Sequence, residues 1–179
     1  MTFCLPNEIE IAGLAFHVRT DFRVILEIFV MLDDPDLSDA DKTEALIRMF
    51  YSERPSDPDT ALQAFTDFVD PRHGSQGKKP SGRLIDWQQD FDLMVAPINH
   101  ILGFECRAAE YLHWRTFLSA YLEIPPESVF ARVLRIREKL RAGKKLEKNE
   151  RNWYNKNRDL VHLKPKFSRA EEELIEAWT

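Results

Sequence analysis

Hydrophobic residues along this chain recur mostly with the period of an α-helix, and one short stretch alternates with the period of a β-strand. Residues 8–11 and 14–19 alternate between apolar and polar or small side chains, and Gly13 stands between the two runs. Alternation on both sides of a glycine turn predicts a β-hairpin. Because two strands alone are marginally stable in water, we expect the hairpin to pack on helices or to pair with another chain.

Helical periodicity begins directly after the hairpin. Residues 22–32 are apolar on most sides, which is typical of a buried helix, and we expect this segment to be the central core helix. Ser38 and Asp41 form a pattern like a capping box at the start of the next helix. A cap followed by proline, at 57–58, precedes a third helix that is predicted over 61–69.

The C-terminal half contains longer helical stripes with more aromatic residues. Pro97 lies inside the first of them, and because an interior proline loses a backbone hydrogen bond, we expect it to kink or split that helix. The last segment places Trp153 among charged residues and is expected to expose one face. The four predicted helices run from about 85 to 102, from 108 to 122, from after Pro126 to near Gly143, and onward from about Leu146.

These patterns predict a mainly α fold of about seven helices, a multi-helix domain with an N-terminal β-hairpin packed on the helices. The polar stretch 71–82 holds three of the six glycines and two prolines, which predicts a mobile linker and a first site of limited proteolysis. The predicted parts are 1–70, the hairpin with acidic helices; 71–82, the linker; 83–163, the aromatic and basic helical part; and 164–179, a tail helix opened by a capping box.

The net charge of −5 hides a strong asymmetry along the chain. Residues 132–166 hold 13 Lys and Arg against 4 Asp and Glu, a balance of +9, while the remainder holds 12 against 26, a balance of −14. A block this basic can bind nucleic acid or an acidic protein surface. It can equally form a solvated helix face, or meet the acidic part of a neighbouring copy.

Composition and motifs exclude several classes. With 44% hydrophobic and 31% charged residues, the sequence is that of a soluble globular protein, and it has neither a long apolar run nor the pattern of a signal peptide. Cys4 and Cys106 form no metal or redox motif, so we expect idle thiols in a reducing cytoplasm.

No catalytic constellation stands out. Glu110-x-x-His113 is half of a di-iron carboxylate motif whose second half is missing. The glycines and lysines at 74–79 resemble a phosphate-binding loop but lack its spacing and its Ser or Thr. We therefore expect a protein that is not an enzyme and that uses no cofactor, metal or small-molecule substrate.

The aromatic residues give the best candidates for a partner interface, although a core role is the simpler interpretation for most of them. Tryptophan and arginine are favoured anchors at protein interfaces, and Trp153 lies in a polar helix where a core role is least expected. The candidate interface residues are Trp114, Arg115, Lys144, Lys145, Trp153 and Tyr154.

Five short motifs follow one another along the chain: Thr20-Asp21-Phe22-Arg23, Asp34-Pro35-Asp36-Leu37-Ser38, Asp86-Trp87-x-x-Asp90-Phe91, Tyr111-Leu112-His113-Trp114-x-x-Phe117-Leu118 and Gly143-Lys144-Lys145-Leu146-Glu147-Lys148. In this order and spacing they resemble a family of small tail proteins from siphophages and prophages of Gram-positive bacteria, called "gene product fifteen" in one such phage. The resemblance covers most of residues 5–163, and the chain after Pro165 lies outside it.

This resemblance implies a non-catalytic tail assembly chaperone. Such a protein binds the largely helical tape measure protein, helps to recruit subunits of the major tail protein, forms a homo-oligomer, works in the host bacterial cytoplasm and is absent from the mature virion. An alternative is a helical module that binds nucleic acid through 132–166. The absence of a known reader motif and an overall pI near 5.6 argue against that alternative.

Overall fold

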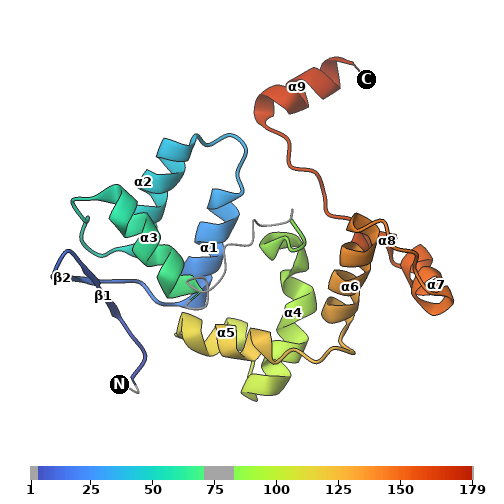
Figure 1. Cartoon of the computed structure of the whole chain (residues 1–179), viewed down its shortest axis with the longest axis horizontal. Helices are drawn as coiled ribbons and strands as arrows, with labels where there is room; N and C mark the ends of the chain where they lie inside the picture. Colours follow the sequence, from blue (N-terminus) through green and yellow to red (C-terminus); the bar gives the residue numbers. More distant parts are fainter. Residues whose placement is uncertain (1–3, 71–82, 179) are drawn as a thin grey trace. The chain divides into compact units, whose positions relative to one another are not determined.

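The computed structural model describes residues 4–70 and 83–178 of the chain (Figure 1). These residues form a β-hairpin and α-helices, which confirms the mainly α fold with an N-terminal hairpin. No helix in this part of the chain is long and apolar enough to cross a membrane. The elements are β1 (Glu8–Ile11), β2 (Leu14–His17), α1 (Phe22–Leu32), α2 (Asp39–Phe50), α3 (Pro58–Val69), α4 (Trp87–Leu102), the 3₁₀ helix η2 (Cys106–Ala108), α5 (Trp114–Leu122), α6 (Val129–Arg141), α7 (Lys148–Lys156), α8 (Arg158–Val161) and α9 (Arg169–Ala177).

The chain divides into two compact units. The first unit contains Met1–Lys78, Tyr111–Phe117 and Lys166–Thr179, and the second contains Lys79–Glu110 and Leu118–Pro165. The linker predicted at 71–82, with its expected proteolysis, lies outside the described residues. The division of the chain into the four parts predicted from the sequence remains a prediction.

The hairpin of the first unit has the predicted position. β1 and β2 pair antiparallel with Ile9 opposite Phe16, and the two turn residues, Ala12 and Gly13, both have positive φ, at 51° and 81°. A two-residue turn with positive φ at both positions matches the twist of the strands, and glycine adopts that conformation without steric cost. After β2 the chain continues extended, and Val18 forms an isolated bridge with Tyr51.

Helix α1 lies in the core of the first unit, as its all-round apolar sequence predicts. Phe22, Ile25 and Ile28 are completely buried. Phe50 of α2 packs edge-on against Phe65 of α3, with ring centroids 4.9 Å apart. Aromatic pairs in such arrangements contribute about 0.5–1.5 kcal/mol beyond the burial of their area, so this contact helps to hold α2 and α3 together.

The prediction of a helix over 108–122 was wrong for the first half of that range. η2 ends at Ala108, α5 begins only at Trp114, and the residues before it are extended. The backbone N–H of Phe22 donates to the Leu112 carbonyl at 2.9 Å, and that of Trp114 donates to the Thr20 carbonyl at 2.6 Å. This pairing with the start of α1 replaces the helical hydrogen bonds that the periodicity of the sequence suggested.

In the second unit, α4 packs against α6, and α6 packs against α8. Pro97 lies within α4, which runs from 87 to 102 without being split. Gly103 ends α4 in the left-handed conformation, as a C-terminal glycine does in many helices. The helix predicted from Leu146 onward starts at Lys148 and is divided into α7 and α8 at Asn157.

Candidate partner-binding surfaces

Two of the short sequence motifs meet in the first unit. Asp21 caps α1, because its carboxylate accepts from the backbone N–H of Arg23 at 2.9 Å and also from that of Leu112 at 3.2 Å. Burial raises the pKa of Asp21, but hydrogen bonds from Arg23 and Leu112 outweigh it and hold the pKa below its ordinary value of 3.8. A hydrogen bond of 2.6 Å joins the hydroxyl groups of Thr20 and Tyr111.

Trp114 lies in the core of the first unit and not on its surface. Its side chain is 2% exposed, and its indole N–H donates to the Val69 carbonyl at 3.0 Å. Phe117, one turn along α5, stacks on Phe22 with ring centroids 4.5 Å apart. Trp114 is one of the six candidate interface residues, and packing in the core is therefore enough to explain a tryptophan at this position.

The two neighbours of Trp114 also have internal contacts. His113 Nδ1 accepts from the backbone N–H of Arg115 at 2.9 Å, so the ring proton lies on Nε2, which donates to the Pro6 carbonyl at 2.9 Å. Arg115 is half-buried with its guanidinium 5.4 Å from the centre of the Phe68 ring, and burial lowers the pKa of Arg115. Both ring nitrogens of His113 are thus used within the protein.

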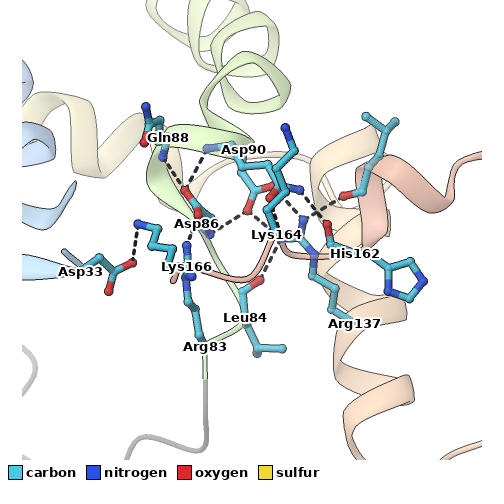
Figure 2. A network of polar contacts seen from close by, with 12 residues as sticks. Asp33, Arg83, Leu84, Asp86, Gln88, Asp90, Arg137, His162, Lys164 and Lys166 are labelled. Atoms are coloured by element: carbon cyan, nitrogen blue, oxygen red, sulfur yellow. Dashed lines mark hydrogen bonds and ion pairs between the residues drawn. The ribbon is translucent and has the colours of Figure 1, made fainter. Parts of the chain in front are cut away.

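A buried ion pair lies in the second unit. Arg137 of α6 and Asp90 of α4 are 5% and 0% exposed, and the guanidinium binds the carboxylate with two hydrogen bonds of 2.6 and 2.9 Å (Figure 2). The remaining donors of Arg137 reach the carbonyls of Leu84, Leu160 and Val161 at 2.6–2.9 Å. All five guanidinium N–H groups therefore have acceptors, which a buried arginine requires.

The neighbouring carboxylate completes this network. Asp86 caps α4 by accepting from the backbone N–H groups of Gln88 and Gln89, both at 2.9 Å, and it also binds Arg83 (Figure 2). The backbone N–H of Asp86 donates to Asp90 at 2.9 Å. Asp86 and Asp90 thus hold α4 in place, and neither is offered to an external ligand.

Helix α7 has a groove on each side, and the first contains Trp153. This Trp153 groove has a volume of about 530 Å³. The Arg132 guanidinium lies 5.4 Å from the centre of the half-buried Trp153 ring, a cation–π contact that holds the indole at the groove wall. Its lining residues are Pro126, Glu127, Arg132, Arg135, Asn149, Glu150 and Trp153.

The second groove is smaller and more basic. This lysine groove has a volume of about 290 Å³ and is lined by Leu140, Lys144, Lys145, Leu146, Arg151, Tyr154 and Asn155. The Tyr154 hydroxyl hydrogen-bonds to His162 Nε2 at 2.8 Å, which fixes the ring that lines the groove. Three cations and no carboxylate line this groove, so it favours an acidic ligand.

The candidate residues thus fall into three places. Lys144, Lys145 and Tyr154 line the lysine groove, Trp153 lines the other groove, and Trp114 with Arg115 belongs to the first unit. The sequence prediction missed Arg132 and Arg135, whose only signal was their place in the basic segment. No cluster of His, Cys, Asp and Glu in the described ranges has the geometry to hold a metal ion.

Comparison with known proteins relates the chain to a protein family. The model of a protein family described as "Bacteriophage Gp15 protein" matches residues 1–163. No curated protein and no solved structure matches the chain. The matched residues include both grooves and end before α9.

Proposed function

The chain belongs to the Bacteriophage Gp15 protein family, and from this premise we propose that it is a tail assembly chaperone of a siphophage or prophage. It binds the tape measure protein in the host cytoplasm, helps to recruit subunits of the major tail protein, catalyses no reaction and is absent from the mature virion. The observation that carries this proposal is the Trp153 groove.

The groove suits an amphipathic helix, and a tape measure protein is expected to be largely helical. Helix-in-groove recognition needs apolar contact area flanked by polar groups that fix the orientation of the guest helix. Trp153 and Pro126 supply the apolar area, and the exposed Arg132 and Arg135 supply the charges. A tryptophan held in place by an arginine is also the kind of side chain that dominates binding energy at interfaces.

The nucleic-acid alternative is weakened by how the basic segment is used. Arg137 is buried against Asp90, and Lys139 forms a 2.6 Å ion pair with Glu150. Arg132 lies over Trp153. The side chains that make 132–166 look like a basic binding surface in the sequence are therefore partly engaged in internal contacts.

Co-expression with the tape measure protein of the same phage tests the proposal. We expect the wild-type chain to keep that protein soluble and to co-purify with it. Trp153→Ala should weaken binding by about 30-fold or more, because truncating a tryptophan anchor costs about 2 kcal/mol or more. Trp153→Phe, which keeps an aromatic ring in the groove, should retain most of the binding.

Phe104→Ala is the control, since it removes an exposed aromatic side chain outside both grooves, and it should leave binding unchanged. Circular dichroism should show that all three variants keep their helix content. The proposal fails if the tape measure protein stays insoluble beside the wild-type chain while that chain shifts DNA at physiological salt.

A further inference from the structure

The most exposed helix of the described chain is α9, which lies outside the residues matched by the family. Ser168 and Glu171 form a capping box at its start, so the helix has its own local stabilisation. None of its residues is buried; Leu174 is 61% exposed, and Trp178 at its C-terminal cap is 89% exposed. Because a tryptophan this exposed gains from leaving water, this helix has the character of an unpartnered interface element.

The exposed side chains of α9 are arranged as an amphipathic and acidic helix. Ala170, Leu174, Ala177 and Trp178 follow the i, i+4, i+7, i+8 spacing of one face. Four glutamates and one arginine give residues 169–178 a net charge of −3. A surface that binds α9 must therefore combine apolar contact area with positive charge.

Within residues 4–70 and 83–178, the ion pairs between α9 and the rest of the first unit lie at or just before the start of the helix. Lys166 binds Asp33 at 3.3 Å (Figure 2), and Arg169 binds Asp36 through a 3.7 Å ion pair and a 2.9 Å backbone hydrogen bond. These contacts precede the apolar face. They orient the helix without covering Leu174 or Trp178.

The lysine groove has the complementary chemistry. Lys144, Lys145 and Arg151 are exposed, and within the described ranges no ion pair holds any of them. The same groove is also lined by Leu140, which is 39% exposed, and by the half-buried Tyr154. The groove thus combines apolar area with positive charge, which matches the apolar stripe and the glutamates of α9.

We propose that α9 of one copy binds the lysine groove of a second copy, with Leu174 and Trp178 on the apolar floor and the glutamates beside the cations. Charge complementarity selects a second copy as the occupant. Each copy carries one such helix and one such groove, so the same contact can form twice in a closed two-fold dimer or link copies head to tail. This inference specifies how the proposed chaperone self-associates, and it does not depend on the Trp153 groove.

Sedimentation of the full-length chain over a range of concentrations tests the contact. We expect concentration-dependent oligomers that weaken as salt rises, because screening reduces the attraction between the glutamates and the cations. Trp178→Ala and Leu174→Asp should each weaken self-association at least tenfold. Truncation after Pro165 should abolish it, and circular dichroism should show that the shortened chain is still folded.

A charge exchange provides the decisive variant. Lys144→Glu with Lys145→Glu should weaken self-association, and adding Glu172→Lys with Glu176→Lys in the same chain should restore it. A chain that stays monomeric at about 0.1 mM overturns the inference. An oligomer that survives truncation also overturns it. So does a Trp178 fluorescence shift that is independent of concentration, because such a shift would indicate that α9 docks within its own chain.

The two proposals fail independently. Trp153→Ala is expected to release the tape measure protein and to leave self-association intact. Lys144→Glu with Lys145→Glu is expected to do the reverse. If both sets of variants affect both measurements equally, the assignment of one groove to each partner is wrong.

Discussion

At the scale of single residues, the polar groups that look most functional in the sequence hold the protein together. Asp86 and Asp90 lie in one of the short motifs that carry the family resemblance. Asp86 caps α4, and Asp90 binds Arg137. His113, which with Glu110 forms half of a di-iron motif in the sequence, uses both ring nitrogens in internal hydrogen bonds. Their residue types fit several roles, and only their partners decide between those roles.

Arg137→Met should lower the free energy of unfolding by about 3–5 kcal/mol, because it leaves the buried Asp90 carboxylate without its cation. Chemical denaturation followed by circular dichroism measures this change. Arg135→Met on the same helix is the control, since Arg135 is exposed and its loss should cost less than about 1 kcal/mol.

The double variant Arg137→Met with Asp90→Leu should be less destabilised than the sum of the two single variants. Removing both charges eliminates the unpaired buried carboxylate, although the carbonyls of Leu84 and Val161 still lose their donor. Strictly additive costs would show that the ion pair is not the source of the effect.

At the scale of elements, the patterns that local chemistry controls were predicted correctly. The hairpin turn at Gly13 and the capping box at Ser168 involve neighbours in sequence, and both are present in the structure. The start of α5 was missed because Leu112 and Trp114 use their backbone groups to pair with residues about 90 positions away. Periodicity carries no information about such a partner.

The turn after α6 gives a test at this scale. Gly143 has φ of 64°, and a Cβ added there would have no atom within 4 Å, so the only cost of a side chain is the left-handed backbone. Gly143→Ala should therefore destabilise the protein by about 1–2 kcal/mol. Gly143→Asn should cost less, because asparagine adopts this conformation more readily.

Thermal unfolding of the two variants decides between these effects. Equal losses for alanine and asparagine would mean that the left-handed conformation is not what Gly143 provides. The same turn leads into Lys144 and Lys145, so a distorted turn should also weaken self-association.

At the scale of the whole molecule, the two units are not consecutive in the sequence. The core of the first unit includes Trp114 and Phe117, which follow the whole of α4 in the chain. The Trp153 groove also combines distant positions, because Arg132 and Trp153 are 21 positions apart in the sequence. The sequence identified Trp153 from its polar surroundings, but the groove itself depends on how α6 and α7 pack.

A fragment of residues 1–78 should therefore fail to unfold cooperatively, because Phe22 lacks the ring of Phe117 and the Val69 carbonyl lacks the indole of Trp114. A fragment of residues 1–122, which contains both side chains, should recover a cooperative transition. Thermal melts at 222 nm compare the two. A sharp transition in the shorter fragment would mean that α1–α3 form a sufficient core alone.

The split core also has a consequence for synthesis on the ribosome. Residues 70–117 must be translated after α3 before the aromatic side chains that cover α1 exist. At about 5–20 residues per second, this interval lasts about 2–10 s. During that time Phe22 and Phe29 of α1 lack the rings of Phe117 and Trp114 that they contact in the folded protein. Ribosome-associated folding factors of the host therefore have an opportunity to bind this part of α1 before Phe117 emerges.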